Sequence, residues 1–160
     1  MRQTVKTRAH GQRGFSLIEL MIVIAIIGIL IGVGIPAWKN SVIAANESGA
    51  IRTLNAINAE ERTYYIRHSS YGTFDQLIDA GALDSRFAGE SPTVNGYTFV
   101  IKVTPKASNQ PAAFTVNADP QVSEGFSATG KRHFYIGSDV NTVRANETQP
   151  ATAQDAPPGS

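Results

Sequence analysis

The chain has 160 residues, a formal net charge of +1 and no cysteine. The absence of cysteine excludes disulfides and thiolate metal sites, and the length allows one domain with an anchor and a tail. Residues 1–14 contain four basic and no acidic side chains, which leaves residues 15–160 near −3. This distribution offers no broad basic surface, so it argues against nucleic acid as a partner.

An apolar run extends over residues 15–35, where Glu19 is the single charged side chain. About 20 apolar residues are enough to cross a bilayer as a helix. A cleaved signal peptide is the alternative, but its apolar region is normally about 7–15 residues and ends at a small-residue site. No good site of that kind follows here. Because the basic residues precede the run, we expect a single-pass anchor with a cytoplasmic N-terminus.

The residues around the start of this run carry a family resemblance. The stretch GFSLIELMIVIAIIGIL begins at Gly14, and Pro36 follows it. It resembles the N-terminal motif of the type IV pilin and pseudopilin family, over about the first quarter of the chain. The resemblance implies that a prepilin peptidase cuts between Gly14 and Phe15 and that Phe15 is then N-methylated. It also implies an assembly ATPase, an inner-membrane platform and, in a Gram-negative cell, an outer-membrane secretin.

Glu19 is an assembly residue on this interpretation. A charge inside a membrane-length segment is costly and calls for a partner. Cleavage would create an α-ammonium at Phe15, one helical turn away on the same side of the helix. Pairing of Glu19 with the ammonium of a neighbouring subunit would compensate both charges and set the register of a polymer. Pairing within one chain stays open as the alternative.

The second half of the run contains helix-weakening residues. Glycine costs a helix roughly 1 kcal/mol relative to alanine, and interior proline about 3 kcal/mol. One interpretation is close packing of membrane helices through a G-x-x-x-G face. The family resemblance implies the other, that this stretch loses helicity when subunits pack into a filament core. The helix-weakening residues are Gly28, Gly32, Gly34 and Pro36. The occurrence of all four within one short stretch favours the second interpretation.

Beyond the run, periodicity predicts an α+β fold with a long helical spine on an antiparallel sheet of about four strands. An apolar stripe from Ile43 to Ile57 continues the helix to about residue 65 or 66. Thr73 and Gln76 predict a capping box for a short helix over 74–80. Alternating and apolar segments predict strands at 97–104, 113–118, 133–136 and 142–145. The expected parts are a leader (1–14), a transmembrane or filament-core helix (15–35), an amphipathic spine (36–70), a globular part (71–145) and a disordered tail (146–160).

No enzyme chemistry is indicated. Phosphate-binding glycine loops, H-E-x-x-H and G-x-S-x-G are absent from the sequence. His68 and His133 have no nucleophile in an obvious pattern, and we expect no cofactor. Asp119, Glu124 and Asp139 fall in loops, but they do not match the calcium-binding loop that major pseudopilins carry, so no metal is predicted.

The resemblance implies the major structural subunit of a type IV pilus, a homopolymer that leaves the inner membrane as an extracellular filament. Adhesion, motility and DNA uptake are not distinguished. One alternative is a type II secretion pseudopilin, which forms a short periplasmic pseudopilus. Another is a minor pilin that acts as a binding module, with Lys131 and Arg132 as candidate DNA contacts. The cysteine pair of many pilins is absent, so hydrogen bonds, packing or neighbouring subunits must close the C-terminal end.

Overall fold

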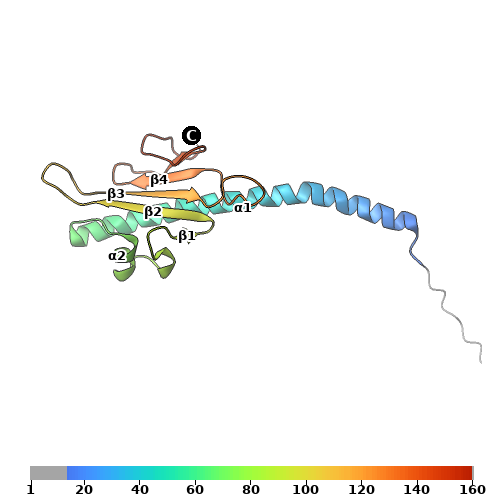
Figure 1. The fold of residues 1–160 in the computed structure, drawn as a ribbon, viewed down its shortest axis with the longest axis horizontal. Helices are drawn as coiled ribbons and strands as arrows, with labels where there is room; N and C mark the ends of the chain where they lie inside the picture. Colours follow the sequence, from blue (N-terminus) through green and yellow to red (C-terminus); the bar gives the residue numbers. More distant parts are fainter. Residues whose placement is uncertain (1–13, 160) are drawn as a thin grey trace, which may run out of the picture. The chain divides into compact units, whose positions relative to one another are not determined.

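The computed structural model describes residues 14–159, which divide into two units at the boundary between Trp38 and Lys39. Helix α1, Leu17–His68, contains Pro36 and passes from the first unit into the second (Figure 1). It ends within three residues of the end predicted from the apolar stripe. A break follows at Ser69, whose φ of 56° lies in the left-handed region and stops helical propagation.

The second unit contains a five-stranded antiparallel sheet in the order β1-β2-β3-β4-β5. Each strand pairs with its neighbour in sequence, so the predicted α+β architecture is confirmed, with five strands rather than about four. The bounds are β1 Thr93–Val94, β2 Tyr97–Thr104, β3 Ala113–Pro120, β4 His133–Gly137 and β5 Arg144–Asn146.

Strand β1 was not predicted because it has only two residues. It joins β2 through Asn95 and Gly96, whose φ values are 51° and 76°. Two consecutive positive φ values match a type I′ turn, which the pair Asn-Gly favours because both residues tolerate this conformation. The Asn-Gly dipeptide was therefore the available signal for this hairpin.

The core lies between the sheet and the Lys39–His68 part of α1, along which the strands run in Figure 1. Leu54 and Ile57 are fully buried, at 0% exposure. Burying one such side chain contributes about 1.5–3 kcal/mol, so the stripe holds the helix on the sheet. From the sheet, the largest fully buried partners are Tyr97, Phe99, Phe114, Val116, Phe134 and Ile136.

Between α1 and the sheet, the chain forms α2, Phe74–Asp79, and a short 3₁₀ helix, Ser85–Phe87. The predicted capping box is present. Thr73 N donates to Gln76 Oε1 at 2.9 Å, and Gln76 N donates to Thr73 Oγ1 at 3.4 Å. The helix ends one residue earlier than predicted.

The C-terminal segment differs from the predicted disordered tail. Its described part, through residue 159, packs against the sheet: Ala151 is 2% exposed, and its carbonyl accepts from Asn117 Nδ2 at 2.9 Å. Asp155 accepts from Asn146 Nδ2 at 2.7 Å and from Thr152 N at 2.7 Å. The lack of large apolar residues suggested disorder, but a small buried alanine and specific hydrogen bonds order the segment instead.

Candidate assembly region on helix α1

Gly14 and Phe15, the predicted cleavage pair, lie just before α1. Phe15 is 88% exposed, and a Cβ on Gly14 would meet no atom within 4 Å. The described residues therefore leave this peptide bond accessible. The rest of the predicted leader, residues 1–13, lies outside the described residues.

Glu19 folds back onto the first turn of α1. Its Oε2 accepts a hydrogen bond from Ser16 N at 2.9 Å. The sequence Ser-x-x-Glu is a capping-box pattern, and a carboxylate near a helix N-terminus also interacts favourably with the helix dipole. A carboxylate has more than one acceptor position, so this local bond is compatible with a further donor. This capping role was not predicted, although the Ser-x-x-Glu spacing was its sequence signal.

The predicted helix-weakening residues lie within unbroken helix. A Cβ added at any of the three glycines would meet no atom within 4 Å, and α1 continues through Pro36. Large apolar side chains from Phe15 to Ile35 are 41% to 88% exposed. Among the described residues, one helix is apolar and long enough to cross a membrane, with a mean hydropathy of 2.8 in its best window.

An ion pair between the buried Glu47 and the partly exposed Arg132 connects α1 to the segment before β4. Glu47 is 6% exposed, and its Oε1 accepts from Lys131 N at 3.0 Å and Arg132 N at 3.3 Å. Its Oε2 lies 2.8 Å from one terminal nitrogen of Arg132 and accepts from Nε at 2.9 Å. The side chain of Arg132, one of the two candidate DNA contacts, is therefore already paired with a carboxylate of the same chain.

Glu61 is a second buried carboxyl group on α1, at 0% exposure. Its Oε2 accepts from Gly72 N at 3.0 Å, whereas Oε1 has no partner among the described residues. Burial raises the pKa of Glu61 to about 7, and the bond from Gly72 opposes that rise. The acids Glu47 and Glu61 fall on the same apolar stripe as Leu54, at spacings of seven residues. That pattern was the sequence signal for two buried carboxyl groups.

The two described histidines make structural contacts. His68 stacks on Tyr64 with ring centroids 4.0 Å apart, and His133 Nδ1 lies 2.6 Å from Asp119 Oδ1. Within residues 14–159, no group of three or more histidine, aspartate or glutamate side chains could hold a metal ion.

The described residues thus contain an exposed apolar helix, with the predicted cleavage pair just before it, and an α+β unit that follows in the chain. Residues 9–35 match the family model described as the prokaryotic N-terminal methylation motif. The chain is 34% identical over 101 residues to the type IV major pilin PilE of Neisseria gonorrhoeae, covering 61% of this chain and 59% of that protein. The resemblance to type IV pilins is thereby confirmed, and the α+β fold agrees with the pilin fold.

Other relatives carry the same kind of name. The chain is 39% identical over 85 residues to the fimbrial protein EcpC of Eikenella corrodens, covering 53% and 49% of the two chains. It is 39% identical over 66 residues to the type IV major pilin PilA of Myxococcus xanthus, covering 41% and 30%. The chain thus spans less than two thirds of each of these relatives. Their names describe filament proteins rather than enzymes, in agreement with the expected non-enzymatic role.

Proposed function

We propose that this protein is the major structural subunit of a type IV pilus, which waits in the inner membrane and polymerises into an extracellular homopolymer. The observation that carries this proposal is the exposure of every large apolar side chain between Phe15 and Ile35, at 41% or more. So much apolar surface is unfavourable in water. A bilayer before assembly, and neighbouring helices after it, would cover that surface in turn.

The roles of the individual residues follow from this proposal. A prepilin peptidase would cut between Gly14 and Phe15 and leave Phe15 as the methylated N-terminus. Glu19 already receives Ser16 N at 2.9 Å, so it is oriented at the very start of the helix. There it would pair with the Phe15 ammonium of the next subunit. The helix would lose helicity in the filament core at the weakening residues Gly28, Gly32, Gly34 and Pro36. Residues 15–35 would form the anchor, and residues 36–70 would form the spine.

The proposed partners are other copies of the chain, the prepilin peptidase, an assembly ATPase and its inner-membrane platform. Nucleic acid is not a proposed partner, because Arg132 is paired with Glu47. The names of the similar proteins favour a long pilus over a short pseudopilus.

Electron microscopy and mass spectrometry of sheared surface filaments test the proposal. We expect abundant long fibres whose subunit begins at Phe15 and carries one methyl group. Glu19→Ala should leave the subunit inserted and processed but should abolish most filaments when no wild-type subunit is present. Glu60→Ala, on the second unit, is the control and should retain assembly. Normal filament yield from Glu19→Ala would contradict the pairing role, and a processed chain without surface fibres would favour the pseudopilus.

A further inference from the structure

The segment between β3 and β4 presents an exposed aromatic side chain. Phe126 is 73% exposed, and Val122 on the same segment is 39% exposed. The segment closes on itself, because Thr129 N donates to Val122 O at 2.8 Å and Val122 N donates to Thr129 Oγ1 at 3.2 Å. We call residues 121–132 the β3–β4 loop. Its two apolar side chains therefore point outward from an ordered loop.

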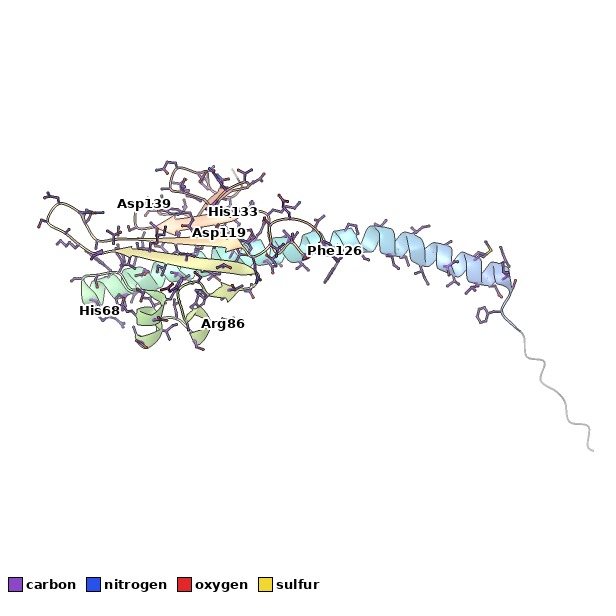
Figure 2. All side chains as sticks on the ribbon, viewed as in Figure 1. His68, Arg86, Asp119, Phe126, His133 and Asp139 are labelled. Carbon is purple, nitrogen blue, oxygen red and sulfur yellow. The ribbon has the colours of Figure 1, made fainter. Side chains whose placement is uncertain are left out.

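Side chains of α1 hold this loop in place. Asn46 Nδ2 donates to Thr129 O at 2.8 Å, and Glu47 receives the backbone N–H groups of Lys131 and Arg132. In Figure 2, Phe126 lies beside α1 at one end of the second unit, and His68 lies at the other end. The position of the exposed ring is thus tied to the first turns of α1 within this unit.

The ring contacts Lys39, a residue that lies close in the chain to the end of the apolar run. Lys39 Nζ lies 5.4 Å from the centroid of the Phe126 ring, a cation–π distance. Lys39 follows Ile35 by four residues, about 6 Å along a helix at 1.5 Å per residue. One helical turn of chain and one lysine side chain therefore connect the ring to the end of the run.

We propose that the β3–β4 loop contacts the phospholipid headgroup layer while the subunit waits in the membrane. This inference rests on the proposed membrane insertion of residues 15–35. An apolar ring such as that of Phe126 is favourable at the boundary between headgroups and acyl chains. The apolar stem of a lysine can lie along the same boundary while its ammonium stays in water. The surface around the loop also carries Glu124 and Glu147 beside Lys39 and Lys131, so opposite charges nearly cancel. The contact is therefore apolar in origin and insensitive to salt.

Fluorescence of the full chain in phospholipid vesicles tests this contact. Trp38 is the single tryptophan, so Trp38→Phe provides a silent background. Three reporters are then compared in that background: Phe126→Trp, Ile26→Trp in the apolar run and Ile66→Trp near the far end of α1. Ile66 is 82% exposed, and 27 residues of helix separate it from Lys39, about 40 Å by the helical rise. The vesicles contain phosphatidylethanolamine and phosphatidylglycerol, brominated near the headgroup or near the chain end.

We expect the reporter at 126 to lose emission with bromine near the headgroup, more than with bromine near the chain end, and equally at low and high salt. The reporter at 26 should lose emission with both lipids, and the reporter at 66 with neither. Quenching at 26 without quenching at 126 overturns the loop contact alone. No quenching at 26 overturns the membrane insertion and the loop contact together. A blue shift at 126 that follows protein density without bromine quenching assigns the loop to a second copy instead.

Discussion

Replacing Glu61 with glutamine should remove a pH dependence of folding that this single carboxyl group creates. Its pKa is about 7 in the folded chain against an ordinary value of 4.5. The folded state therefore binds more protons than the unfolded state between these values, and stability falls as pH rises through that window. At about 1.36 kcal/mol per pKa unit, the full loss is about 3 kcal/mol above pH 7, and it vanishes below pH 4.5.

Glutamine keeps an oxygen for Gly72 N and carries no charge to desolvate. Near pH 4.5 we expect the free energy of unfolding of Glu61→Gln to equal that of wild type or to be slightly lower. Near pH 8 it should be higher than that of wild type by up to about 3 kcal/mol. Denaturant unfolding of the full chain in detergent, followed by near-ultraviolet circular dichroism across this range, measures the difference. Glu60→Gln, at the neighbouring and less buried position, is the matched control. Its free energy of unfolding should depend on pH with the same slope as that of wild type. An identical slope in wild type and Glu61→Gln would refute the reasoning.

Three further changes address other parts of the molecule. Gly14→Lys should block leader removal, and an unchanged mature mass would reject the assigned cut. Arg132→Ala should leave Glu47 buried without its cation and lower the free energy of unfolding by about 3 kcal/mol. This is the lower end for a buried pair, because Arg132 is partly exposed. Chemical denaturation measures the loss, and a change near zero would contradict the prediction. Asp155→Ala should detach the C-terminal segment, seen as faster amide exchange in β5 with the rest of the sheet protected. Because hydrogen bonds lower the pKa of Asp155, acid should cause the same local loss in wild type, and unchanged exchange in either case argues against this role.

Local patterns predicted much of this fold. Strand β2 has the bounds expected from its alternation, and the bonds between Thr73 and Gln76 match the capping box read from their spacing. These features depend on residues close in sequence, so a linear pattern carries them. The start of α1 is similar, since the motif around Glu19 is local and also matches the family model.

The missed features depend on contacts between distant residues. Glu47 meets Arg132 across 85 positions, and Asn117 meets Ala151 across 34. Composition alone cannot show that a polar, alanine-containing end segment finds specific hydrogen-bond donors on a sheet. It also cannot show which acids on a helix stripe become buried, because that depends on the strand that covers them.

The closure of the C-terminal end by Asp155, Asn146 and Thr152 has a consequence for how the protein matures. A C-terminal segment that is held by hydrogen bonds needs neither an oxidant nor a disulfide isomerase outside the cytoplasm. Reducing agents should leave its stability untouched, and the sheet can close, open and close again without trapping mispaired thiols. The second unit can thus reach its final form in whichever redox environment it meets.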